Sequence, residues 1–217
     1  TSDSLQEFKK NKDLILYFPL LKKNIKRLNL SHNPYPMYIG GIDKNLKIKK
    51  CNSQCLIDDY PLNQFTNDLE KFYLSRQYSR LYFVKNLKEN YGDLFHLYGT
   101  NKWNLYELKS KSIGFDKKAR MKEYSNAGIC VDFLPQTSNS CIYNRTLEIF
   151  NAGCILIQWK TFNSEIVFGQ EYSDLFCFDS VYEMISIINE VRSNGLDYYD
   201  NIRKNAIKRI QIYQDKI

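Results

Sequence analysis

The stretch that decides the fold is YNRTLEIFNAGCILI, residues 143–157. It predicts a short helix, a glycine stop and then a buried strand. Leu147 and Phe150 lie three residues apart, as on one face of a helix, and Asn144 is a good N-cap. Gly153 accepts the left-handed conformation that ends a helix. The apolar run that follows is typical of a parallel strand covered on both faces.

Two charged residues are left over in this stretch. Arg145 and Glu148 lie three residues apart in the first turn, on one side of the predicted helix. A charged pair at the mouth of a buried αβ unit is where an α/β protein would hold a polar ligand. The competing interpretation is an i,i+3 ion pair on a solvated helix face, worth about 0.2–0.5 kcal/mol.

Outward from this stretch, helical and strand-like patterns alternate from residue 67 to the end of the chain. Such an order needs crossovers, which predicts a Rossmann-like α/β fold with a mostly parallel sheet and helices on both faces. Ligands of these sheets bind at the carboxyl ends of the strands. Helices are expected at 67–89, 117–124, 144–152, 181–191 and 200–213, strands at 94–98, 128–134, 154–158 and 175–178, and ligand loops at 99–103, 135–145 and 158–161.

The first 60 residues give weaker signals. A short strand is expected at 37–39, entering Gly40-Gly41, a turn whose backbone amides could approach a phosphate. We predict a separate N-terminal segment over residues 1–60 and a Rossmann-like domain over 61–217. Arg80, in the helix that opens the second domain, is expected on a solvated face, with phosphate contact as the minority interpretation.

Composition limits the partners. The 217 residues carry a formal net charge of +7, which favours anionic partners such as nucleoside diphosphates or, peripherally, an anionic membrane surface. The charge is dispersed without an aromatic-basic repeat, so we expect no nucleic-acid partner. Cys51 and Cys55 have a CxxxC spacing without a second cysteine pair or a nearby histidine, so a zinc site is weakly supported. The six cysteines, with no apolar run near the roughly 20 residues of a membrane span, predict a reduced cytoplasmic protein.

Several motifs follow one another along the chain: 80–87, Tyr98-Gly99 with Trp103, 144–153, Asp174-Leu175-Phe176 and the helix at 181–191. Their order resembles a known family, the CgeB-like glycosyltransferases of the GT-B class. The similarity covers roughly residues 76–215, their C-terminal donor-binding domain, and its most specific part is the Arg-x-x-Glu helix with Ala-Gly at its end. The resemblance implies that residues 61–217 form a nucleotide-sugar-binding domain and that residues 1–60 are a partial acceptor-side domain or extension.

The resemblance implies an enzyme that transfers a sugar from a nucleoside-diphosphate sugar to a glycan, protein or other acceptor, without a metal or other cofactor. By position, Glu148 would accept hydrogen bonds from the ribose hydroxyls, and Arg145 would offset charge on the diphosphate leaving group. These two are the candidate catalytic residues. The implied donor-binding set is Gly99, Trp103, Tyr143, Asn144, Arg145, Thr146, Glu148 and Lys160.

The sequence also departs from the GT-B pattern. The first acidic residue of the paired-Glu motif has no match in 137–143, and an acceptor domain of normal size is missing. A catalytic base is therefore not assigned; His32 is a candidate only because it lies in a predicted loop, and His96 is expected in the core. One alternative is a non-catalytic nucleotide-sugar-binding or scaffold module that acts with a partner subunit. A fucosyltransferase-like GT-B enzyme is a weaker one.

Overall fold

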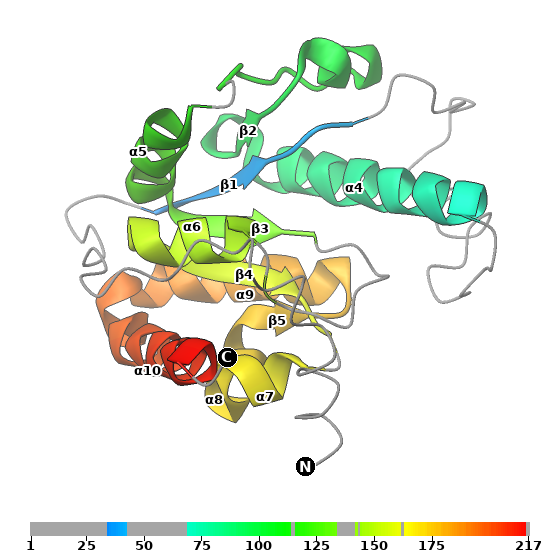
Figure 1. Ribbon diagram of the computed structural model, residues 1–217. Coiled ribbons are helices and arrows are strands. Elements are labelled where there is room, and N and C mark those ends of the chain that lie inside the picture. The colour runs from blue at the N-terminus through cyan, green and yellow to red at the C-terminus, as the bar shows by residue number, and fades with distance from the viewer. Residues whose placement is uncertain are drawn as a thin grey trace.

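The protein is built on one parallel β-sheet with helices on both faces (Figure 1). The computed structural model describes residues 34–42, 69–113, 116–133, 142, 144–161 and 163–215, with the backbone alone at 69–76 and 213–215. Every strand pairing is parallel, and the strand order is β2-β1-β3-β4-β5. The α/β, Rossmann-like prediction is confirmed. The strands are β1 (Tyr35–Ile39), β2 (His96–Tyr98), β3 (Gly128–Asp132), β4 (Ile155–Trp159) and β5 (Cys177–Phe178).

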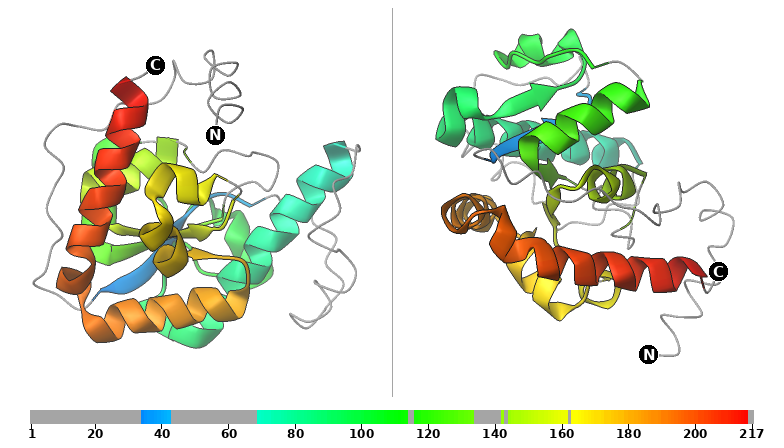
Figure 2. Two further views of the ribbon diagram at one scale, coloured as in Figure 1. Left: turned by 90° about the horizontal axis from the view of Figure 1, so that it is seen from below. Right: turned by 90° about the vertical axis from the view of Figure 1, so that its left-hand side faces the viewer.

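Helices form a layer on each side of the sheet. The long ones are α4 (Leu69–Tyr91), α5 (Lys117–Ala127), α6 (Asn144–Ala152), α9 (Val181–Asn194) and α10 (Leu196–Asp215), and the short ones are α7 (Ser164–Phe168), α8 (Gln170–Phe176), η1 (Gly92–Leu94) and η2 (Asn101–Tyr106). Helices α4 and α9 pack together against one face, and α5, α6 and α8 lie against the strands from the other side. Figure 2 shows α10 beside α7 and α8.

Residues 144–157 form the helix, the glycine stop and the strand that the sequence predicts. Helix α6 begins at Asn144 and buries every residue from Thr146 to Ala152. Gly153 has a φ of 83°, and its N–H donates to the Phe150 carbonyl at 3.0 Å, which closes the helix. Strand β4 follows directly and is buried except at its last residue.

The predicted strand at 175–178 is mostly wrong. Helix α8 continues to Phe176, and β5 is only two residues long. Tyr172 and Phe176 lie four residues apart on α8, are both fully buried, and contact each other with ring centroids 4.7 Å apart and the ring planes tilted by 52°. This helical spacing buries both rings on one side of α8. A short apolar run fits a strand and a buried helix equally well, so the sequence did not distinguish the two.

Strand β1 corrects the predicted domain boundary. It pairs with β2 on one side and with β3 on the other, so it lies in the middle of the sheet. A division after residue 60 would separate this strand from both of its neighbours. Residues 34–42 therefore belong to the same structural unit as the rest of the sheet.

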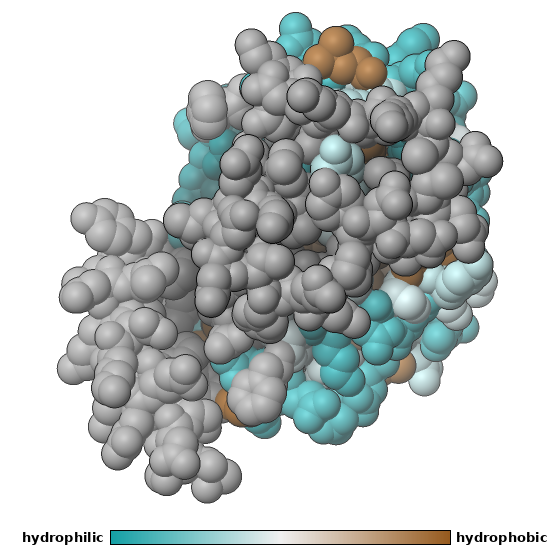
Figure 3. Space-filling view, turned by 90° about the vertical axis from the view of Figure 1, so that its right-hand side faces the viewer, coloured by the Kyte–Doolittle hydropathy of each residue, from teal (hydrophilic) through white to brown (hydrophobic). Residues whose placement is uncertain are grey.

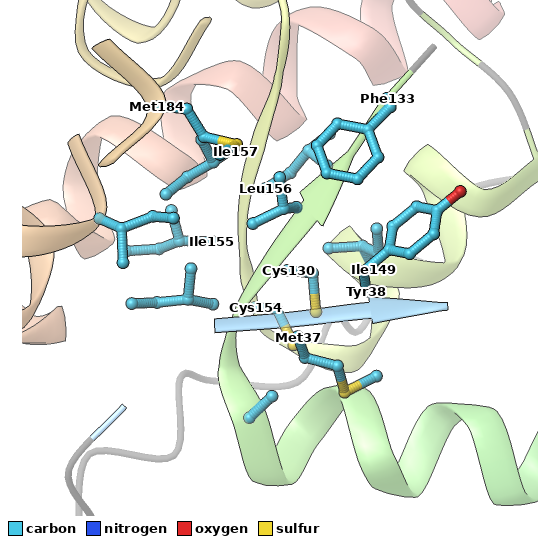
Figure 4. Packing of buried hydrophobic residues seen from close by; sticks show 14 of the residues in the cluster. Met37, Tyr38, Cys130, Phe133, Ile149, Cys154, Ile155, Leu156, Ile157 and Met184 are labelled. Atoms are coloured by element: carbon cyan, nitrogen blue, oxygen red, sulfur yellow. The ribbon is translucent and has the colours of Figure 1, made fainter. Parts of the chain in front are cut away.

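The core lies on both faces of the strands (Figure 4). Alternation along β3 and β4 sends Phe133 and Trp159 toward α4, where Phe83 stacks on Phe133 with ring centroids 4.9 Å apart. Cys130 and Cys154 are buried free thiols, as predicted for cysteines in apolar runs.

The surface at the carboxyl ends of the strands is mostly polar where the structure describes it. Figure 3 shows this side, and its coloured residues are largely hydrophilic with small separate hydrophobic spots. Within the described ranges, none of the helices combines the length and apolar character needed to cross a membrane.

Candidate functional site

The strand order places a crevice between β1 and β3. From β1 the chain moves to β2 on one side, and it returns to β3 on the other side. Helices after such a reversal leave in opposite directions, and open α/β sheets bind their ligands at this switch point, outside the carboxyl ends of the strands. The residues that follow the two strands here are Gly40-Gly41 and Phe133. The candidate site is therefore centred on β1 and β3.

Arg145 reaches this crevice from the first turn of α6. Its Nη1 donates to Oδ1 of Asp132, the last residue of β3, at 2.7 Å. The Asp132 side chain is 3% exposed and that of Arg145 is 31% exposed. The guanidinium also lies 5.6 Å from the ring centroid of Tyr38 in β1. Arg145 thus bridges the two strands that flank the switch point.

The electrostatics keep this guanidinium charged. Burial lowers the pKa of Arg145, but the charge of Asp132 and its hydrogen bond, together with the nearby Tyr38 and Tyr124, outweigh this effect, and the pKa is raised. Because one ion-pair partner occupies only one of its two terminal nitrogens, the group retains further donors.

Glu148 is held by a different helix. Arg120 of α5 donates to both of its carboxylate oxygens, from Nη2 at 2.9 Å and from Nε at 3.2 Å. This hydrogen bonding to Glu148 is the main reason that the pKa of Arg120 is raised. Their side chains are 20% and 11% exposed, so the pair joins α5 to α6 at a largely buried position.

The two charged residues singled out in the sequence therefore do not pair with each other. Among the described residues Arg145 is bonded to β3 and Glu148 to α5. The solvated i,i+3 ion pair is wrong, because both side chains turn inward to partners from other elements.

Three further residues of the predicted donor-binding set, Tyr143, Asn144 and Thr146, are neighbours of Arg145 in the sequence. Asn144 is exposed in the first turn of α6, and because α6 begins at this residue, Asn144 stands inside the helix and not at the cap position. Thr146 is fully buried. Tyr143 lies outside the described residues, as does His32.

Trp103 belongs to the core, and Gly99 lies half-buried beside it. A Cβ on Gly99 would lie 2.2 Å from the Gly40 carbonyl oxygen, so the two glycines let these loops touch. Trp103 is fully buried and its Nε1 donates to that same oxygen at 2.8 Å. The Gly99 N–H donates to Lys111 O at 3.0 Å. The ring of Trp103 therefore has no exposed face for a ligand, whereas the donor-binding role of Gly99 stays a prediction.

Lys160 lies at the carboxyl end of β4, away from the switch point. Its ammonium is 3.6 Å from Glu165 of α7 and 3.8 Å from Asp174 of α8, and all three side chains are more than a third exposed. Such exposed pairs contribute little to stability. The two carboxylates reduce the positive field that Lys160 offers to an anion.

Arg80 lies beside the loop that follows β1, and its expected position on a solvated face is wrong. Its Nη1 donates to the Gly41 carbonyl at 3.3 Å, and its side chain is half-buried. Figure 1 shows its helix, α4, extending past the edge at which the strands end. The available signal was its position one helical turn before Phe83, which anchors α4 to the sheet.

The histidine and metal predictions have separate outcomes. His96 is half-buried in β2 and contacts Tyr35 with ring centroids 4.2 Å apart. It is not the core histidine that was expected, and its Nδ1 has no hydrogen-bond partner among the described residues. Burial, with the nearby charge of Lys111, lowers its pKa.

Across the described part of the chain, no three His, Cys, Asp or Glu side chains are grouped to hold a metal ion. Metal independence stays a prediction.

Comparison with known proteins gives no matching family model, no similar curated protein and no similar solved structure. The resemblance to the CgeB-like glycosyltransferases therefore stays a prediction made from the motifs of the sequence.

Proposed function

We propose that the protein binds a nucleoside-diphosphate sugar at the carboxyl edge of its sheet and transfers the sugar to a glycan, protein or other acceptor. The observation that carries the proposal is the position of Arg145. It stands at the β1/β3 switch point, is charged, and is held by Asp132 with donors to spare. A guanidinium so fixed can offset the charge that a diphosphate leaving group takes up.

Glu148 fits the same proposal as a ribose-binding carboxylate. A carboxylate has about four acceptor positions, and Arg120 uses one on each oxygen. The remaining lone pairs can accept from two vicinal hydroxyls, and Arg120 fixes the orientation in which they do so. Arg120 is in this view a positioning residue for Glu148.

The alternative is a non-catalytic nucleotide-sugar-binding or scaffold module that acts with a partner subunit. One observation favours it: both candidate catalytic side chains already have ion-pair partners within the fold. A catalytic base is not identified among the described residues, and a partner subunit could supply one.

Thermal unfolding in the presence of UDP, GDP, dTDP, CMP and the corresponding sugar nucleotides tests the binding step. A ligand at 100 times its Kd stabilises the native state by about 2.7 kcal/mol, which for a domain of this size raises Tm by about 5–10 °C. We expect at least one nucleoside diphosphate to do so, and Glu148→Gln to lose more than half of the shift. Asp93→Asn, a fully exposed carboxylate on η1, is the matched control.

Turnover separates the two functions. Slow hydrolysis of the bound sugar nucleotide, measured as released nucleoside diphosphate, supports the transferase, and binding without turnover in the presence of an acceptor pool supports the scaffold module. If none of these ligands raises Tm, the proposed site is wrong.

A further inference from the structure

Two hydrogen-bond donors next to the Gly40-Gly41 loop have no hydrogen-bond partner in the part of the chain that the structure describes. Tyr38 is fully buried, and its hydroxyl makes no hydrogen bond to a described residue. The Nε of Arg80 is also buried, and it has no partner among the same residues. Buried polar groups are almost always paired, and each exception calls for an explanation such as a ligand or ion that completes it.

The two unpaired donors lie against adjacent residues. A Cβ placed on Gly40 would be 2.3 Å from the Tyr38 hydroxyl, so that hydroxyl occupies the space that glycine leaves free. The Nη1 of Arg80 is 3.3 Å from the carbonyl oxygen of Gly41. Figure 4 shows the Tyr38 hydroxyl pointing away from the labelled core residues, on the side where the β1 arrow ends.

A third donor group approaches from α6. The Arg145 guanidinium lies 5.6 Å from the centre of the Tyr38 ring. Asp132 balances the charge of Arg145, whereas Arg80 forms no ion pair with any acid in the described part of the chain. The cluster of Tyr38, Arg80 and Arg145 therefore has a surplus of donors and one uncompensated positive charge.

We infer that Tyr38, Arg80 and Arg145 form a phosphoryl-binding subsite that takes the diphosphate of the ligand. The donors come from β1, α4 and α6, hence from three directions, which suits a tetrahedral phosphate better than a planar carboxylate. The claim that this diphosphate belongs to a nucleotide rests on the proposed function. The subsite itself recognises a diphosphate, which could come from a nucleoside diphosphate or from free pyrophosphate.

Inorganic pyrophosphate is the probe, and isothermal titration measures its affinity for the purified chain. Charge-assisted hydrogen bonds predict that Arg80→Gln weakens binding at least tenfold and that Tyr38→Phe weakens it about threefold to tenfold. Arg192→Gln is the matched control. Arg192 donates from Nε to the Pro34 carbonyl at the opposite end of β1 and stacks on Tyr91, so its loss leaves the affinity unchanged.

Tyr38→Phe gives a second, opposite readout. Removing an unpaired buried hydroxyl raises the Tm of the free protein, while the same change lowers the affinity for pyrophosphate. A purely structural tyrosine would lower Tm and leave the affinity alone, which would overturn the inference.

The remaining outcomes separate this inference from the proposed function. The subsite is wrong if pyrophosphate does not bind the wild type, or if Arg80→Gln binds pyrophosphate and sugar nucleotides as tightly as the wild type. In the latter case the proposed function stands. If pyrophosphate binds as predicted while sugar nucleotides do not, the subsite stands and the proposed function fails.

Discussion

Replacing Arg145 by alanine tests whether this residue is as important for stability as for binding. The change leaves the Asp132 carboxylate, 3% exposed, without its ion pair. Breaking a fully buried pair costs about 3–5 kcal/mol. Arg145 itself is 31% exposed, so water already screens part of the attraction, and we expect a loss of about 2–4 kcal/mol in the free energy of unfolding.

The reverse change is milder. Asp132→Asn leaves a guanidinium with about a third of its side chain in water, and it keeps an oxygen that can accept the hydrogen bond, so the expected loss is about 1–2 kcal/mol. The double variant, Arg145→Ala with Asp132→Asn, has neither the guanidinium nor the unpaired carboxylate. We expect it to be at least about 1 kcal/mol more stable than the sum of the two single losses predicts.

Urea unfolding followed by circular dichroism measures all three variants. The reasoning is refuted if Asp132→Asn costs more than Arg145→Ala, or if the two losses simply add. The design also matters for binding experiments, because a ligand-induced Tm shift that is lost in Arg145→Ala alone could come from the damaged fold. A shift that is also lost in the more stable double variant reports on the binding site.

Three further predictions concern the surroundings of the crevice. Gly99→Ala forces its Cβ against the Gly40 carbonyl and is expected to lower the free energy of unfolding by about 2–4 kcal/mol in the same urea assay. Gly41→Ala is the control: its Cβ would meet nothing within 4 Å, so its free energy of unfolding should stay within about 0.5 kcal/mol of the wild type. Trp103→Phe loses a buried hydrogen bond and some packing, which is expected to lower the free energy of unfolding by about 2–3 kcal/mol in the urea assay. The affinity for nucleotide should stay unchanged. A weaker affinity in isothermal titration would show that the ring does contact the ligand. Burial lowers the pKa of His96, so the unfolded chain binds the proton more tightly and stability falls as the pH drops below about 6.5. His96→Gln should flatten that part of the stability profile, and an unchanged profile would contradict the assigned cause.

Local signals in the sequence predicted the local elements. Helix α6, its glycine stop and strand β4 follow from a periodic apolar stripe, a glycine and an apolar run that lie close together in the sequence. Helices α9 and α10 carry the same kind of periodicity. The α/β class followed because strands separated by helices leave few other arrangements.

The partners of the charged residues could not be predicted in this way. Arg145 pairs with Asp132 on the preceding strand, and Glu148 pairs with Arg120 on a helix 28 residues earlier. The i,i+3 rule concerns only neighbours on one helix surface, so it has no information about contacts that the tertiary fold creates. Trp103 was misplaced for the same reason, because a tryptophan in a loop gives no sign of which loop will cover it.

The central position of β1 has a consequence for how the chain folds. Its two neighbours are both made later, so a nascent chain carries β1 with two open edges until β2 ends at Tyr98 and with one open edge until β3 ends at Asp132. Pairing between segments so distant in the chain raises the contact order, which slows folding. During these intervals the open edges of β1 expose a newly made molecule to aggregation.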